Sequence, residues 1–187
     1  DPETALDDVA DAAVAAGVSA IWVHARKAWL EGLSPAQNRD VPPLDHDRVH
    51  RLRARLPVFV GINGGIGTVG EVHEQAARVD GVMIGRAAYQ RPGILTALAG
   101  LGGEEDRRHR LAVARQMADY ADALAVRGGR PHAVTKHMLG LFHGEPGARE
   151  WRRTLTVAGQ APGASGDVLR RAVDAIAAAG EIASAAA

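Results

Sequence analysis

The chain has 187 residues, of which 47% are hydrophobic and 24% are charged, as in an ordinary globular protein. Its formal net charge is zero, so a surface for a polyanion must be local. The lack of cysteine excludes a disulfide framework, a cysteine-ligated zinc and a cysteine nucleophile within these residues. No apolar run approaches the roughly 18 residues of a membrane span, and no signal peptide opens the chain. We therefore expect a cytoplasmic protein without a membrane partner, of undetermined oligomeric state.

Three helix–strand pairs are predicted in the first 100 residues or so. Apolar side chains at helical spacing predict a first helix that is capped by Asp1 and ends at Gly17. A second helix is expected over 45–56, and a third begins at Thr68, where Glu71 completes a capping box. Short apolar strands are predicted at 18–24, 58–62 and 81–84.

The three strands are continuously apolar rather than alternating, which is typical of a parallel sheet covered on both faces. Polar or special residues follow each strand: His24, residues 63–65 and residues 85–86. Parallel α/β folds place their sites at these carboxyl ends of strands. The sequence therefore predicts an α/β fold with a site at one end of the sheet.

The composition changes near residue 100, after which no strand is predicted. The glycine-rich residues 100–103 are interpreted as a hinge, and the chain is divided into domains 1–100 and 101–187. The second domain is expected to be helical, and its alanine-rich end is interpreted as a frayed helix or tail. Its helices are predicted near 104–127, 131–143, 147–157 and 166–180.

Two glycine turns form the main candidate site: Asn63, Gly64 and Gly65 after one strand, and Gly85 and Arg86 after the next. Glycine lets several backbone N–H groups converge on a phosphate, and an arginine adds a fixed cation. The alternative is that the glycines only form tight turns. Two adjacent turns followed by an arginine favour a phosphate site.

A second glycine pattern, Gly65-x-Gly67-x-x-Gly70, matches the dinucleotide-binding fingerprint. That fingerprint expects an acidic residue at the end of the next strand, to hold a ribose. Here the next strand ends in Gly85 and Arg86. We therefore disfavour a Rossmann fold.

His24 ends a buried strand at the mouth of the expected site. It could donate a hydrogen bond to a ligand or titrate there, or be a structural histidine satisfied by backbone. Arg26 and Lys27 add positive charge at the same rim. His46 and His50 are interpreted as an exposed helix face, and no metal site is expected.

A basic segment lies between residues 130 and 153. Within it, Arg149 and Arg152 are three residues apart, so they share a helix face. A local cationic face suits a phosphate backbone. From charge alone, a solvated helix face is the favoured interpretation.

Four motifs, in the right order, resemble the A-type tRNA-dihydrouridine synthases. They are residues 24–39 (HARKAWL, GLSP and NR), 62–66 (INGGI), 80–89 (DGVMIGRAAY) and 136–153 (KHMLGLF, PGAR and WRR). The resemblance implies the C-terminal portion of a (β/α)8 TIM barrel, about strands 6–8, followed by an all-α tRNA-binding domain. It also implies FMN as cofactor, NADPH as reductant, and hydride transfer to uridines 20 and 20a of the tRNA D loop, with the target base out of its stack. By motif position, FMN contacts are His24, Asn63, Gly64, Gly65, Gly85 and Arg86, and tRNA contacts are Arg39, Arg149 and Arg152.

The resemblance also implies parts that this sequence lacks. The family's proton-donating cysteine and its flavin-binding lysine and glutamine are expected before Asp1, and the start without Met is interpreted as a fragment or a processed product. Such a chain is expected to be inactive alone, with open sheet edges and an unclosed barrel. Two alternatives stay open: a non-catalytic RNA-binding module on the same fold, and another FMN- or phosphate-binding TIM-barrel oxidoreductase.

Overall fold

The computed structural model describes residues 4–29, 31–103 and 106–185. Two compact units divide the chain, with the boundary between Ala88 and Tyr89. This boundary falls inside α4 (Arg86–Gln90). Each unit has its own hydrophobic core.

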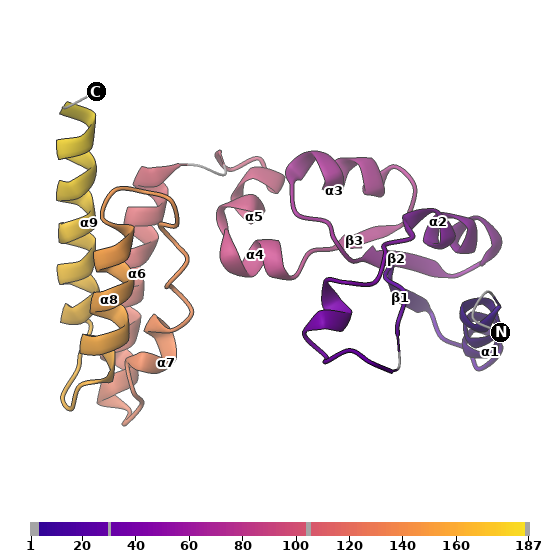
Figure 1. The fold of residues 1–187 in the computed structure, drawn as a ribbon, viewed down its shortest axis with the longest axis horizontal. Coiled ribbons are helices and arrows are strands. Elements are labelled where there is room, and N and C mark those ends of the chain that lie inside the picture. Colours follow the sequence, from indigo (N-terminus) through magenta and orange to yellow (C-terminus); the bar gives the residue numbers. More distant parts are fainter. Residues whose placement is uncertain (1–3, 30, 104–105, 186–187) are drawn as a thin grey trace. The chain divides into compact units, whose positions relative to one another are not determined.

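Three parallel strands form the sheet of the first unit, in the order β1-β2-β3. The strands are β1 (Ala20–His24), β2 (Phe59–Asn63) and β3 (Gly81–Met83). Helices α1 (Ala5–Ala15), α2 (His46–Arg55) and α3 (Val69–Ala76) alternate with them along the chain (Figure 1). His24 pairs with Asn63, and Asn63 with Met83, so the three strands end level with one another. The predicted α/β order and parallel sheet are confirmed.

Local capping signals set the ends of these helices. The Thr68 side chain accepts from the Glu71 amide, and both halves of the predicted capping box are present. Asp45 caps α2 by accepting from the Arg48 amide at 3.0 Å. Gly17, at φ +89°, follows the end of α1 in the left-handed conformation that glycine accepts. The cap expected at Asp1 lies outside the described residues.

The two faces of the sheet are not equally covered in the described part of the chain. Val23, Val60 and Ile62 point into the core beneath α2, and their side chains are at most 8% exposed. On the other face, Trp22 and Phe59 remain 46% and 38% exposed, with ring centroids 5.5 Å apart. The expectation that both faces are covered is therefore wrong for these residues. The strands are apolar on both faces, but the described residues cover only one of them with helices.

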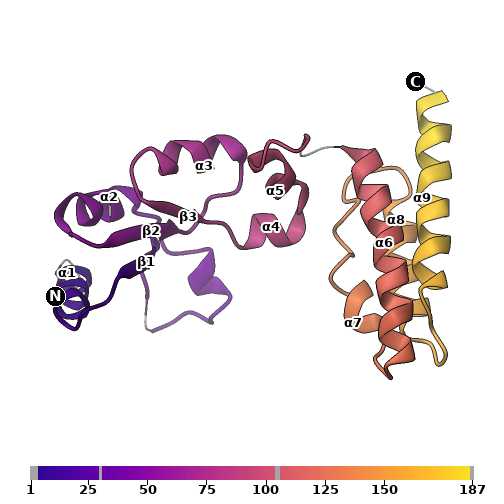
Figure 2. The same cartoon turned by 180° about the vertical axis from the view of Figure 1, so that it is seen from behind.

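The second unit is helical. Its elements after α4 are α5 (Gly93–Leu98), α6 (Arg107–Val126), α7 (His132–Thr135), α8 (Ala148–Val157) and α9 (Asp167–Ala185). Helices α6 and α9 run side by side in opposite directions (Figures 1 and 2), and α8 packs against α9. Phe142 and Trp151 meet edge to face in the core, with centroids 4.8 Å apart.

One predicted helix of this unit is wrong. Residues 131–143 contain only the single turn α7 and then a series of tight turns. After α7 the backbone closes tight turns, such as the one in which the Leu141 amide donates to the Met138 carbonyl oxygen at 3.1 Å. The indole Nε1 of the buried Trp151 donates to the same oxygen at 2.9 Å and ties these turns to α8. The short helices α4 and α5 were not expected from the sequence.

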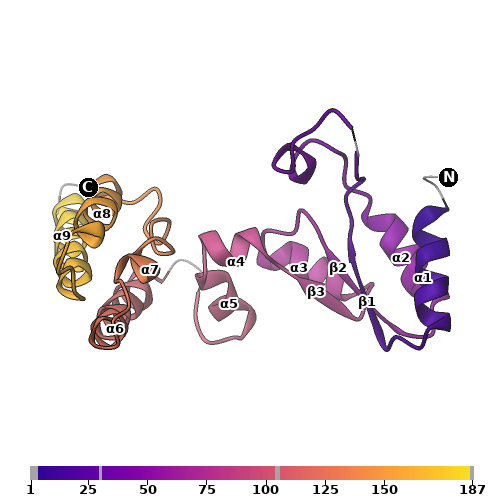
Figure 3. The same ribbon diagram turned by 90° about the horizontal axis from the view of Figure 1, so that it is seen from below.

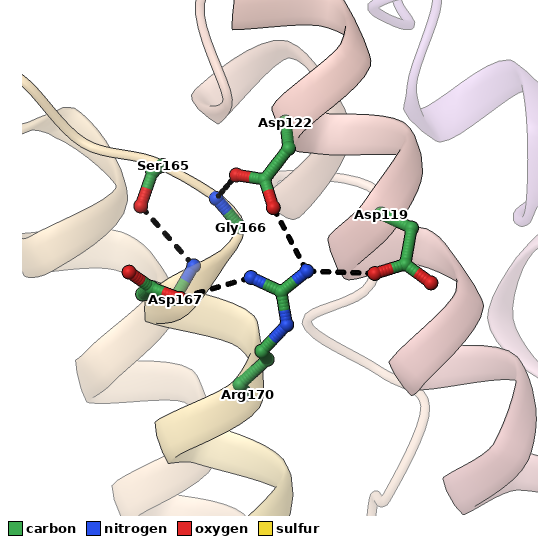
Figure 4. Close-up of polar contacts among 6 residues, drawn as sticks. All are labelled: Asp119, Asp122, Ser165, Gly166, Asp167 and Arg170. Atoms are coloured by element: carbon green, nitrogen blue, oxygen red, sulfur yellow. Dashed lines mark hydrogen bonds and ion pairs between the residues drawn. The ribbon is translucent and has the colours of Figure 1, made fainter.

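A charged cluster ties the start of α9 to α6 (Figure 4). The Arg170 guanidinium contacts the carboxylates of Asp119, Asp122 and Asp167 at 2.6, 2.8 and 2.9 Å. Asp122 also accepts from the Gly166 amide at 2.6 Å. That backbone hydrogen bond, followed by the Arg170 side chain, holds the pKa of Asp122 below its usual value.

Candidate functional site

Asn63 connects the ends of all three strands. Its backbone lies in β2, its Oδ1 is 2.7 Å from Nδ1 of His24 at the end of β1, and its Nδ2 donates to the Met83 carbonyl oxygen of β3 at 2.7 Å. The Asn63 carbonyl also accepts from the Ala25 amide at 2.7 Å. The carboxyl ends of the strands are therefore one connected polar surface, as the sequence predicts.

These contacts fix the tautomer of His24. The carbonyl oxygen of Met83 can only accept, so the Asn63 amide must place its nitrogen there and its oxygen towards His24. His24 Nδ1 is therefore the donor in that pair. In the neutral ring, Nε2 is left as an acceptor, and only the protonated ring donates from Nε2. His24 is exposed, so this second nitrogen is open to a ligand.

The turn after β2 requires two glycines. Gly64 has φ +119° and Gly65 has φ +73°, conformations that other residues rarely adopt. A Cβ on Gly64 would lie 3.2 Å from the Ala25 amide nitrogen, and one on Gly65 would collide with the Leu44 side chain. The turn is thus both left-handed and tightly enclosed, so glycine is required at both positions.

The turn after β3 brings a cation to the same end of the sheet. Gly85 has open space where a Cβ would stand. Arg86 follows it, is half exposed, and forms an ion pair with the Asp40 carboxylate. Asp40 belongs to the connection between β1 and α2, so this pair joins the β3 turn to that loop.

Arg26 braces the same loop from within. Its guanidinium donates to the Asp40 carbonyl oxygen at 3.0 Å and to the Pro42 carbonyl oxygen. Arg26 was expected to add positive charge at the rim, but its side chain is half-buried and engaged with these backbone oxygens. Arg26 therefore stabilises the loop backbone at Asp40 and Pro42.

Arg39 lies at the end of the 3-10 turn η1 (Gln37–Arg39) in this loop. Figure 3 shows that the loop projects well beyond the carboxyl end of β1. The side chain of Arg39 is outside the described part of the structure. The backbone therefore carries Arg39 on a projecting loop of the first unit.

The predicted basic residues of the second unit lie on α8. Arg149 and Arg152 are exposed. Arg153, beside them, donates to the Glu150 carboxylate at 2.8 and 2.6 Å and is thereby engaged. The same contact, the largest influence on Glu150, holds the pKa of its carboxyl below the usual value. Arg149 and Arg152 are thus exposed cations of α8, while Arg153, which is also exposed, is held by Glu150.

The amides at the start of α3 are already occupied. The Glu71 carboxylate accepts from the Gly67 and Thr68 amides at 2.8 and 3.0 Å, and the Gly67 contact contributes most to lowering the pKa of Glu71. A Rossmann fold would place a pyrophosphate at these amides. An anion at this end of the sheet would therefore meet the 63–65 turn rather than the helix.

The sequence interpretation missed the role of one histidine pair. His46 and His50 are half-buried rather than exposed: His46 Nε2 donates to the Gly64 carbonyl oxygen at 2.9 Å, and His50 Nε2 is 2.8 Å from Gln75 Oε1. Their spacing alone gave no signal of these partners, which lie 18 and 25 residues away. His46 therefore contacts, from the start of α2, the turn that forms the candidate site.

The described residues contain no group of three or more side chains able to hold a metal ion. Within the same residues, none of the helices combines the length and apolar character that crossing a bilayer requires.

The chain was compared with known proteins. The family model described as Dihydrouridine synthase (Dus) matches residues 1–177. A tRNA-dihydrouridine(20/20a) synthase of Salmonella typhi is 46% identical over 158 residues, which cover 83% of this chain and 48% of that protein. The synthases of the same name from Shewanella oneidensis and Escherichia coli K12 are 41% and 44% identical, over 89% and 83% of this chain and 50% and 46% of their own lengths. This chain thus spans about half the length of the relatives it matches. The family match, the relatives and the polar surface at the strand ends agree, and the chain belongs to the dihydrouridine synthase family.

Proposed function

We propose that this chain forms the cofactor-phosphate and tRNA-binding half of an enzyme that reduces uridine to 5,6-dihydrouridine in the D loop of tRNA, with FMN as cofactor and NADPH as reductant. The observation that carries the proposal is the shared polar surface at the ends of β1, β2 and β3. In this proposal residues 1–100 are strands 6–8 of a TIM barrel with their helices, and residues 101–187 are the tRNA-binding domain.

The residues at the strand ends fit a flavin phosphate. The turn of Gly64 and Gly65 supplies backbone N–H groups in a conformation where no Cβ intervenes, and Arg86 supplies a cation with a planar fork of donors. Gly85 leaves room for close approach. His24 offers Nε2 as an acceptor for a hydroxyl or, when protonated, as a donor. Asn63 aligns these groups by joining the three strands.

The residues at the strand ends would hold FMN, and the chemistry that the bound cofactor would supply, once reduced, is a hydride for one carbon of the uracil ring. The contribution of this chain is to hold the cofactor end at the turns and to hold the tRNA so that the target base stays out of its stack. Arg39 on the projecting loop, and Arg149 and Arg152 on α8, neutralise backbone phosphates of the tRNA. The chain has no cysteine, so we assign the proton donor to the half of the family's length that it does not span.

The test uses the full-length gene product. The purified protein is expected to be yellow, to be bleached by NADPH without oxygen, and to form dihydrouridine in an unmodified tRNA transcript. A colourless protein that takes up no added FMN overturns the proposal. A colourless protein that still binds tRNA supports instead a non-catalytic RNA-binding module.

A further inference from the structure

The peptide between Gly64 and Gly65 is held from outside the turn. Its carbonyl oxygen, on Gly64, accepts a hydrogen bond from His46 Nε2 at 2.9 Å. His46 is the first residue of α2, in the segment between β1 and β2, whereas the turn follows β2. A side chain from another element therefore decides which way this peptide faces.

Fixing the carbonyl also fixes the amide. In a trans peptide the C=O and the N–H of the same plane point in opposite directions, and no cis peptide occurs in the described residues. The Gly65 N–H must therefore point away from His46 and α2. Within the described part of the chain, this N–H donates no hydrogen bond.

A glycine pair needs such an anchor. With φ values of +119° and +73°, Gly64 and Gly65 have conformational freedom on both sides of the shared peptide. Without an anchor, the peptide plane between two glycines can rotate, so its N–H points towards the ligand position for only part of the time. The free energy of anion binding would then include the cost of ordering this peptide plane. The contact with His46 supplies that order before a ligand arrives.

His46 is itself well placed to act as the anchor. The preceding Asp45 caps α2 with its side chain, and its amide donates to the Ala25 carbonyl at 2.8 Å. The start of α2 is thereby tied to the end of β1. His46 is half-buried, so its hydrogen bond to the Gly64 carbonyl is partly shielded from competing water.

We propose that His46 is a positioning residue that presents the Gly65 N–H to the phosphate of the cofactor. The proposal rests on the proposed function, because it requires an anion at this turn. It adds to that function a residue outside the glycine motifs, one whose effect is confined to the phosphate end of the ligand. Riboflavin, which lacks the phosphate, does not depend on it.

The experiment compares the affinities of the full-length apoprotein for FMN and for riboflavin. In His46→Phe, which keeps a ring but removes the donor, FMN binding is expected to weaken by about tenfold, the scale of one hydrogen bond to a charged group. Riboflavin binding stays unchanged and reports that the variant is folded. His46→Gln, whose amide nitrogen stands near the position of Nε2, restores FMN affinity.

The matched control is His50→Phe, one turn further along α2. His50 is also half-buried, but it contacts Gln75 rather than the turn. This variant is expected to bind FMN and riboflavin as the unchanged protein does. Equal FMN loss in the two phenylalanine variants, or an equal loss of riboflavin in His46→Phe, overturns the role of His46. A wild-type protein that binds neither flavin overturns the proposed function as well.

Discussion

A phosphate at Arg86 would meet a guanidinium that is already engaged with a carboxylate. The guanidinium forms an ion pair with the Asp40 carboxylate, and the two side chains are 56% and 63% exposed. An exposed pair of this kind contributes about 0.2–1 kcal/mol. Asp40 also repels an incoming phosphate, because both carry negative charge. Asp40→Asn should therefore strengthen FMN binding by about 1.4- to 5-fold at low ionic strength.

This substitution leaves the loop in place. Arg26 donates to the backbone carbonyl of Asp40, not to its carboxylate, so the brace at 3.0 Å survives in the asparagine variant. The Kd for FMN is measured by the quenching of flavin fluorescence in the full-length apoprotein. Arg86→Gln is the opposing variant, in which loss of a charged donor should weaken FMN by about tenfold or more.

The direction in which Asp40→Asn changes the FMN affinity shows whether Asp40 competes with the phosphate. Tighter binding of FMN, with riboflavin unchanged, means that Asp40 competes with the phosphate for Arg86. Weaker binding of FMN would refute this reasoning, because it would mean that Asp40 orients Arg86 towards the ligand. The strengthening should also shrink in high salt, which screens exposed charges.

Three further outcomes are expected. Gly65→Ala places a Cβ at φ +73° and against a neighbouring side chain, so FMN titration should show loss of binding by at least about tenfold, and an unchanged Kd would contradict the enclosed turn. Arg149→Gln should weaken tRNA binding and lower the slope of log K against log salt by about one, measured by filter binding. Arg153→Gln should change this slope less, because the Arg153 guanidinium is already engaged with Glu150. The Gly166 amide lowers the pKa of Asp122 in the folded state, so the ionised carboxylate stabilises the fold above its unfolded pKa, and this stabilisation is lost as pH falls through the folded pKa. Between about pH 5 and 2, the Tm of Asp122→Asn should therefore fall less than the Tm of the unchanged protein. An equal fall in Tm would exclude Asp122 as a source of the acid sensitivity.

The sequence alone predicted the strands, the helix cap and the glycine turn, because each of them depends on residues that are close together in the chain. The apolar runs located the three strands, and the Thr68 capping box is formed by residues three apart. The turn at 63–65 was recognisable because its consecutive glycines follow a strand, and their positive φ values are ones that other residues rarely adopt. These features require no knowledge of what packs against them.

The features that were missed depend on distant partners. The hydrogen bond of His46 joins residues 18 apart, and the ion pair of Asp40 joins residues 46 apart. The turns within 131–143 are tied to α8 by the hydrogen bond from the Trp151 indole to the Met138 carbonyl oxygen, 13 residues away. The bare face with Trp22 was also missed, because an apolar strand does not specify how many helical layers its own chain provides.

The hydrogen bonds of Asn63 bear on how the site ages. An asparagine followed by a glycine is the dipeptide most prone to deamidation, in which the next backbone nitrogen attacks the side-chain carbonyl carbon and ammonia leaves. In this protein, His24 holds the oxygen of that amide and the Met83 carbonyl holds its nitrogen. Cyclisation onto Gly64 needs the side chain to turn out of both contacts. The network that aligns the strand ends thus also slows the chemical decay of the most vulnerable bond in the site.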